Sequence, residues 1–222
     1  MLQEAISRSS SLMARLNAAT TSLHDDRELF AGRVSWLDYR LYLVRLYGFH
    51  AAVEAALTAF RPLATVVADA ALRNHKTALL AADLVALGMD RRDLAQVPRM
   101  VFAVPRALPE ALGWTYVVES ATLRGKLLAR RLARQLPDEI QRASAYLGCY
   151  GDEAVTRWRE LGDAIDAFAL RLEAQAERAA ERGASATELD CARVIEAARD
   201  GAIQLRCWVG PVLQPRTTRR HA

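Results

Sequence analysis

Apolar residues recur at steps of three and four along almost the whole chain, the spacing that places side chains on one face of an α-helix. This pattern predicts about seven to nine helices, and no stretch shows the alternation typical of a strand. The expected helices cover 12–30, 36–60, 63–72, 76–87, 110–135, a shorter segment that begins at Pro137 and ends near 148–151, 152–182, and a last helix that runs to Val209.

Residues that start and stop helices set these boundaries. Ser35 is the expected N-cap of the helix over 36–60, Asn74 that of the helix over 76–87, and Ser185 that of the last helix. Gly32 ends the first helix, and the stretch 96–109, with three prolines, predicts a long irregular connection.

The fold class that follows is all-α, a single-domain multi-helical bundle. At 222 residues the chain is long enough for one domain with a full core, and no linker rich in Pro, Gly or Ser divides it. We expect the domain to cover residues 1–210, followed by a disordered basic tail over 211–222.

Composition excludes several protein classes. The net charge of +4 and the pI near 9.2 are only mildly basic, and Arg216, Arg219 and Arg220 supply much of the excess, so nucleic-acid binding is not expected. No stretch reaches the ~20 apolar residues of a membrane span. Charged residues interrupt the N-terminus where a signal peptide would be apolar.

The cysteines are too few and too scattered for a disulfide framework or a zinc site. They are Cys149, Cys191 and Cys207. Reduced thiols indicate a cytoplasmic location.

His24 is the first candidate for chemistry. Thr20, His24 and Glu28 follow one another at intervals of four residues, so they share one face of the expected helix. A neutral imidazole binds iron well, and a hydrogen bond to its second nitrogen tunes the metal, a role open to Glu28. Considered alone, a single histidine at the edge of an apolar stripe is typical of a solvated side chain.

The other histidines compete poorly as metal ligands. His50 follows two aromatic residues and is expected to pack beneath them, His75 lies at a helix start, and His221 is in the tail. Without a Glu-x-x-His motif, a di-iron site in the bundle is not expected.

The second candidate is the helix that contains Ala121 and Gly125, two small residues one turn apart on its apolar stripe. A glycine inside a helix costs up to ~1 kcal/mol relative to alanine, so it usually has a structural or functional reason. The reason is the close approach of a ligand or of another backbone. The spacing alone favours packing against another helix.

Four segments, in this order, resemble the heme oxygenase family, especially its bacterial, phytochrome-associated branch. Residues 16–20 have its Leu-x-x-Ala-Thr pattern before the histidine, and residues 113–119 its Gly-Trp-x-Tyr-Val-x-Glu start of the distal helix. Residues 79–84 and 146–161 are also similar to family segments. The resemblance covers roughly residues 12 to 170.

This resemblance implies that heme is both substrate and cofactor, with His24 as the axial iron ligand and Glu28 supporting it. It implies cleavage with O2 and external electrons to biliverdin, CO and ferrous iron. The resemblance also implies an electron donor such as a ferredoxin or a reductase. The purpose of the reaction would be to supply biliverdin to a bacteriophytochrome or to release iron.

The distal segment departs from the family pattern. An alignment without gaps on Gly113 and Glu119 puts Ser120 and Arg124 where the family has glycines, and of the small residues expected there only Gly125 remains. By resemblance, Ser120, Ala121, Arg124 and Gly125 are the residues that shape the oxygen pocket.

The cations expected to bind the heme propionates also differ. Many family members have a basic residue seven positions before the histidine, where this chain has Asn17. Lys126, Arg130 and Arg157 are the other candidates, because arginine and lysine at a pocket rim can pair with carboxylates.

Three other functions remain as alternatives. Ser120 and Arg124 favour a catalytically silent relative that binds heme, a bilin or another ligand. A helical transcription regulator needs a compact recognition helix, whereas the first sixty residues predict two long helices. A thiamin-degrading or salvage enzyme with a related all-α fold needs a nucleophile, and no cysteine here has a neighbouring acid–base motif.

Overall fold

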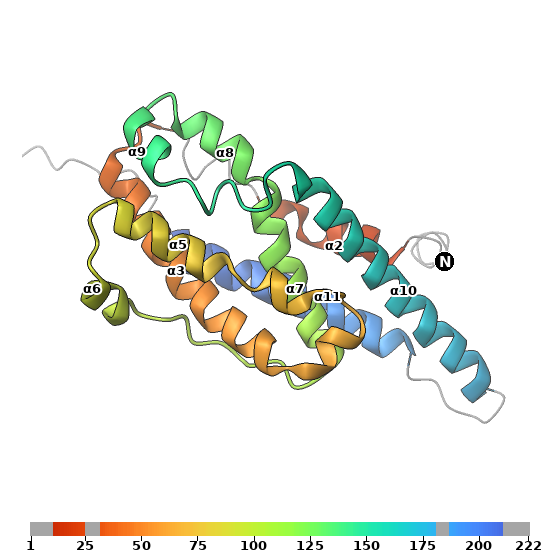
Figure 1. The fold of residues 1–222 in the computed structure, drawn as a ribbon. Coiled ribbons are helices and arrows are strands. Elements are labelled where there is room, and N and C mark those ends of the chain that lie inside the picture. Colours follow the sequence, from red (N-terminus) through yellow and green to blue (C-terminus); the bar gives the residue numbers. More distant parts are fainter. Residues whose placement is uncertain (1–10, 25–31, 181–186, 211–222) are drawn as a thin grey trace, which may run out of the picture.

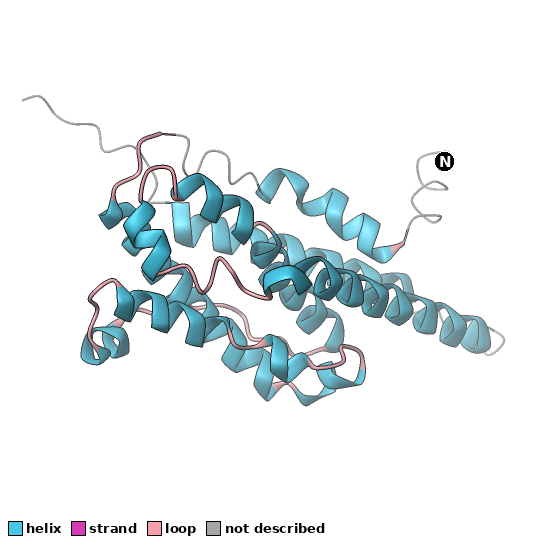
Figure 2. Cartoon of the chain, turned by 45° about the horizontal axis from the view of Figure 1, so that its top comes forward, coloured by secondary structure: helices cyan, strands magenta, loops and turns pink. Residues whose placement is uncertain are grey.

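The computed structural model describes residues 11–24, 32–180 and 187–210, which form helices joined by loops (Figure 1). No strand occurs within these ranges, and the cartoon in Figure 2 shows helix and loop alone, so the predicted all-α class is confirmed. The helices are α2 (Leu12–Thr20), η1 (Thr21–His24), α3 (Trp36–Ala59), η2 (Arg61–Thr65), α4 (Ala70–Arg73), α5 (Lys76–Ala86), α6 (Arg91–Gln96), α7 (Leu108–Leu123), α8 (Gly125–Leu132), α9 (Pro137–Arg142), η3 (Gly151–Glu153), α10 (Ala154–Ala180) and α11 (Thr187–Val209), the η elements being 3₁₀-helices.

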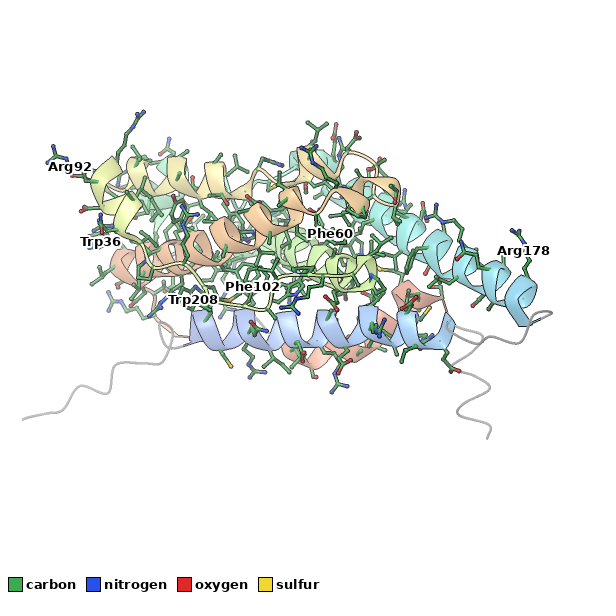
Figure 3. All side chains as sticks on the ribbon, turned by 90° about the horizontal axis from the view of Figure 1, so that it is seen from below. Trp36, Phe60, Arg92, Phe102, Arg178 and Trp208 are labelled. Atoms are coloured by element: carbon green, nitrogen blue, oxygen red, sulfur yellow. The ribbon has the colours of Figure 1, made fainter. Side chains whose placement is uncertain are left out.

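Helix α7 is the centre of the molecule and is buried along almost its whole length. It packs most extensively against α11, and Gly113 makes this close approach possible because a Cβ there would lie 2.6 Å from the carbonyl oxygen of Val194. The ring of Trp114 makes an edge contact with the ring of Phe102, with centroids 4.7 Å apart; Phe102 is labelled in Figure 3. A helix that is apolar on all sides is expected to be buried in this way.

The other long helices surround α7. Helix α2 lies on α10 and α11, and the backbone N–H of Met13 donates to the Asp166 carboxylate on α10 at 2.8 Å. Helix α3 pairs with α5 and also contacts α11. There the indole N–H of Trp208 donates to the carbonyl of Arg45 at 2.7 Å (Figure 3). Helices that carry candidate site residues are therefore held from several sides.

The first helix is shorter than the period predicts. It ends as an α-helix at Thr20 and tightens into η1, while residues 25–31 lie outside the described ranges. The hydroxyls of Thr20 and Thr21 donate to the carbonyls of Leu16 and Asn17, at 2.9 and 2.6 Å. Such bonds compete with the helical ladder, which is why threonines weaken a helix interior.

The single helix expected over 110–135 is also wrong, because the chain breaks at Arg124 into α7 and α8. Before the break, Ser120 donates its hydroxyl proton to the carbonyl of Val117 and Thr122 to that of Glu119, at 2.9 and 2.7 Å. At the break, Gly125 packs directly on another backbone segment. Neither effect changes the spacing of apolar residues, which continues from α7 into α8. The sequence pattern therefore does not show the break.

The helix expected over 63–72 is replaced by η2 and α4. They are separated near Asp69, whose φ of 58° is left-handed and incompatible with a continuous α-helix. The segment after Pro137 is helical only as far as Arg142. Helix α6 was not predicted, because six residues are too few to establish a period.

Of the predicted caps, Ser35 is confirmed and Asn74 is wrong. Ser35 accepts from the N–H of Asp38, whose carboxylate accepts from the N–H of Ser35, a complete capping box. The first N–H groups of α5 are instead bound by Glu54 of α3, at 2.8 Å from Lys76 and 3.1 Å from Thr77. Ser185 lies outside the described residues, as do Glu28 and the tail over 211–222.

Candidate functional site

The candidate site lies where the C-terminal end of α2 meets α7 (Figure 1). His24 is the last residue of η1, four residues after Thr20, and the structure describes its backbone alone. Its role as iron ligand, with that of Glu28, stays a prediction. What the structure adds is the set of side chains from α2 and α7 that meet one turn before His24.

Tyr116 joins the two helices through its hydroxyl group. The hydroxyl donates to Asn17 Oδ1 at 2.9 Å and lies 2.8 Å from Thr20 Oγ1. Its ring packs on Trp158 of α10, with centroids 5.3 Å apart. Burial raises the pKa of the Tyr116 hydroxyl, while its hydrogen bond with Thr20 and the positive charge of Arg124 act in the opposite direction. Sequence reasoning placed Asn17 in the site and missed its contact with Tyr116, as well as the contact of Tyr116 with Thr20.

Ser120 and Arg124 follow Tyr116 at one and two turns along α7, so they share its face of the helix. Ser120 is buried, and its hydroxyl is turned back onto its own helix. Arg124 stands at the break between α7 and α8 and is half-buried. The structure therefore brings the side of α7 that carries Ser120 and Arg124 next to Tyr116 and Asn17.

Gly125 has a packing partner that explains its lack of a side chain. A Cβ at this position would lie 2.4 Å from the carbonyl oxygen of Leu147, a distance that real Cβ contacts do not reach. The loop between α9 and η3 therefore rests on the start of α8. Of the two reasons that the sequence left open, close approach of another backbone is the one observed, and the role of Gly125 in an oxygen pocket stays a prediction.

The three cations predicted to bind propionates have surroundings different from those of Tyr116. Lys126 is 44% exposed and pairs with Asp152 at 2.7 Å, and Arg130 is exposed on α8. Arg157 of α10 has carboxylates on three sides, with closest N–O distances between 3.4 and 3.8 Å. These belong to Asp69, Glu153 and Glu160.

A buried polar cluster lies beside the candidate site, and sequence reasoning missed it. Glu119 is 2% exposed and accepts from Lys76 Nζ at 2.7 Å, Tyr150 Oη at 3.1 Å and Arg73 Nη1 at 3.2 Å. Lys76 is fully buried and also donates to the carbonyl of Arg73. Burial and the charge of Glu119 raise the pKa of the Tyr150 hydroxyl. Glu119 on an otherwise apolar helix was the only signal for this cluster in the sequence.

His50 and His75 are both held by contacts within the fold. His50 is fully buried and packs against Phe49, as predicted. It also contacts Tyr146, whose hydroxyl lies 3.1 Å from Nε2. His75 begins α5 and has Nε2 3.6 Å from the sulfur of Cys149, where burial raises the thiol pKa to about 11. A thiol of that pKa is a poor nucleophile at neutral pH.

Two further findings bear on the class of site. Within the described ranges, no three His, Cys, Asp or Glu side chains converge as a metal site would require. No helix in the same part of the chain has the length and apolar character needed to span a membrane.

Comparison with known proteins identifies a family and a solved structure of similar fold. The sequence profile of the heme oxygenase family matches residues 10–189. The fold is similar to that of the NO- and CO-bound heme oxygenase from Neisseria meningitidis, with a TM-score of 0.67 and 22% sequence identity over 90% of this chain and 92% of the other. No curated protein sequence matches the chain.

Proposed function

Because this chain belongs to the heme oxygenase family, we propose that it binds heme between α2–η1 and α7 and degrades it. The observation that carries the proposal is the link from Tyr116 to Asn17 and Thr20, which places the helix ending at His24 beside the distal segment, residues 120–125. The resemblance in the sequence alone already assigned these two segments to opposite faces of the heme.

The residues between the two helices fit a flat ligand with an apolar face and an acidic edge. Leu16 and Val117 are fully buried members of the same apolar core cluster, so the region where the two helices meet is apolar. Tyr116, Asn17 and Arg124 supply hydroxyl, amide and guanidinium donors, groups that bind carboxylates. Heme has this combination of an apolar macrocycle and two propionates.

Each residue then has a proposed role. His24 holds the iron through its imidazole, with Glu28 one turn later as the partner of its second nitrogen. Asn17 and Tyr116 orient the ligand, and Lys126, Arg130 and Arg157 are the candidate cations for its propionates. When bound, heme supplies the iron at which oxygen is activated and the ring that is cleaved.

The residues of the distal segment control what can approach the ligand. Ser120 is a small residue, and its hydroxyl donates to the carbonyl of Val117 in its own helix. Ala121 is small, and Arg124 brings a positive charge that acts on the Tyr116 hydroxyl. We propose biliverdin, CO and ferrous iron as products, with electrons from a ferredoxin or a reductase, and a bacteriophytochrome as an acceptor of biliverdin.

Arg124 also favours a second candidate function, that of a heme or bilin binder without turnover. Its side chain replaces a family glycine at the break between α7 and α8, on the face of the helix shared with Tyr116. A long cation there can occupy space that oxygen needs. Both functions share the binding site and differ in whether the ring is cleaved.

Turnover by the hemin-loaded protein separates them. We expect that reduced ferredoxin, supplied in air, converts the Soret band to a bilin absorption and releases one CO per heme. Arg124→Gly restores the glycine of the family and is expected to convert at least as fast as the wild type. A stable Soret band in the wild type, with conversion in Arg124→Gly, would identify the silent binder. A stable band in both would contradict the proposed reaction.

A further inference from the structure

Glu119 ends the segment 113–119 that resembles the family and directly precedes residues 120–125, yet the resemblance assigns no role to its side chain or to the buried polar groups around it. We define the Glu119 cluster as Glu119 of α7, Arg73 of α4, Lys76 of α5 and Tyr150 of the loop before η3. We infer that Glu119 is a positioning residue, which sets the rotation and height of residues 120–125 relative to the ligand. The effect of Glu119 on a bound ligand rests on the proposed function. The restraint that Glu119 places on α7 is independent of that function.

Both carboxylate oxygens of Glu119 are occupied, and the donors come from separate segments. Oε1 accepts from Lys76 at 2.7 Å and from Tyr150 at 3.1 Å, and Oε2 accepts from Arg73 at 3.2 Å. Successive residues of an α-helix point about 100° apart. A slip of α7 by one residue would therefore remove Glu119 from all of its donors, so the cluster specifies one register of the helix.

The cluster also connects α7 to α10. Arg73 donates from Nη1 to the carbonyl of Arg157 at 3.1 Å and from Nη2 to the carboxylate of Glu160 at 3.2 Å. The residue after Arg157 is Trp158, whose ring packs on Tyr116. One buried guanidinium thus ties together the helix that carries the distal segment and the helix that supports Tyr116.

The charges make this restraint strong. Arg73 and Lys76 are 4% and 0% exposed, and Glu119 is the buried carboxylate that both of them contact. The second acidic partner of Arg73, Glu160, is 49% exposed. Removing one partner of a buried ion pair leaves the other charge without compensation, which is far more costly than losing a surface pair. Lys76 would be left with uncharged partners, among them the Tyr150 ring 5.0 Å away.

Hydrogen exchange on the ligand-free protein tests the inference, with Glu119→Gln compared to Glu54→Gln. Glu54 is a matched control because it is also a buried carboxylate, 5% exposed, whose hydrogen bonds go to Lys76 and Thr77 at the start of α5. We expect Glu119→Gln to accelerate exchange of the amides of residues 120–125 by at least about tenfold, relative to α11 in the same protein. Glu54→Gln should accelerate the start of α5 instead.

Equal acceleration of residues 120–125 in the two variants, or none in Glu119→Gln, would overturn the inference. If Glu119→Gln does not fold, Tyr150→Phe removes a single donor and must still accelerate these amides more than those of α11. Glu119→Asp keeps the charge and should recover part of the protection.

A second readout is the Soret maximum of the hemin-loaded variants. A positioning role predicts that the maximum of Glu119→Gln is displaced from that of the wild type, whereas Glu54→Gln matches the wild type. Coincident maxima in all three proteins would contradict a positioning role toward the ligand. If no variant and no wild-type protein binds hemin, the proposed function fails, and the exchange experiment still decides the restraint on α7.

Discussion

Tyr116 shows how much of the candidate site rests on one side chain. Its hydroxyl links α7 to Asn17 and Thr20 of α2, and its ring packs against Trp158 of α10. The sequence indicated Asn17 and the helix that carries Tyr116, because each lies in a recognisable segment. Their contact, across almost a hundred residues, depends on how the helices pack, and no local pattern contains that information.

Substitution Tyr116→Phe should lower the free energy of unfolding by about 1 kcal/mol, the usual cost of one lost buried hydrogen bond. It should also weaken hemin binding, because a donor between the two helices is lost. Tyr39→Phe is the control, since Tyr39 likewise donates a buried hydroxyl proton, to the carbonyl of Ala143, but lies outside the site. Urea unfolding and hemin titration of both variants measure the two effects, and equal hemin affinities would argue against a role for Tyr116.

His50 makes stability depend on pH. Burial and the charge of Lys76 hold the pKa of His50 well below its usual 6.5, so the folded protein keeps this ring neutral. The unfolded chain binds a proton there below pH 6.5, and stability must fall as pH decreases through this range. For one histidine the loss reaches up to about 2 kcal/mol at pH 5.

Urea unfolding at pH 7.5 and pH 5 measures this loss, with His50→Gln as the reference without the ring. The difference between wild type and variant isolates His50 from Asp83, where burial raises the pKa and acts in the opposite direction. Identical pH dependence in the two proteins would exclude His50 as the source.

At the level of elements, local signals predicted the long helices well. Ser35 and the period after it define α3, and the prolines of 96–109 define an irregular connection. The errors occur where tertiary contacts decide. Glu54 caps α5 from another helix, and α7 ends at Arg124 although the apolar period continues. Side chains distant in sequence set these two boundaries, so periodicity could not locate them.

The junction of α7 and α8 gives a direct test of the role of Gly125. Gly125→Ala places a methyl group 2.4 Å from the Leu147 carbonyl oxygen, and the loop must move to accept it. We expect a loss of about 1–3 kcal/mol in the free energy of unfolding, as in other overpacked cores. Gly32→Ala is the control, because nothing lies within 4 Å of a Cβ there. Unchanged stability of Gly125→Ala would show that packing does not require this glycine.

For the whole molecule, the sequence predicted the all-α class and the family, and both are confirmed. In the proposed function, a histidine near the start of the chain and a helix with small residues a hundred positions later belong to one site. The details that set this chain apart are Ser120, Arg124 and Asn17. Ser120 donates to the carbonyl of Val117, Asn17 accepts from the hydroxyl of Tyr116, and the charge of Arg124 acts on that same hydroxyl.

The central claim is that this protein binds heme through His24, and a visible-absorption titration with hemin tests it most directly. We expect a saturable Soret band in the wild type and in His75→Ala, a control that removes a histidine outside the site, and loss or strong weakening of the band in His24→Ala. A wild-type protein without a Soret band, or a band that His24→Ala leaves unchanged, would contradict the account.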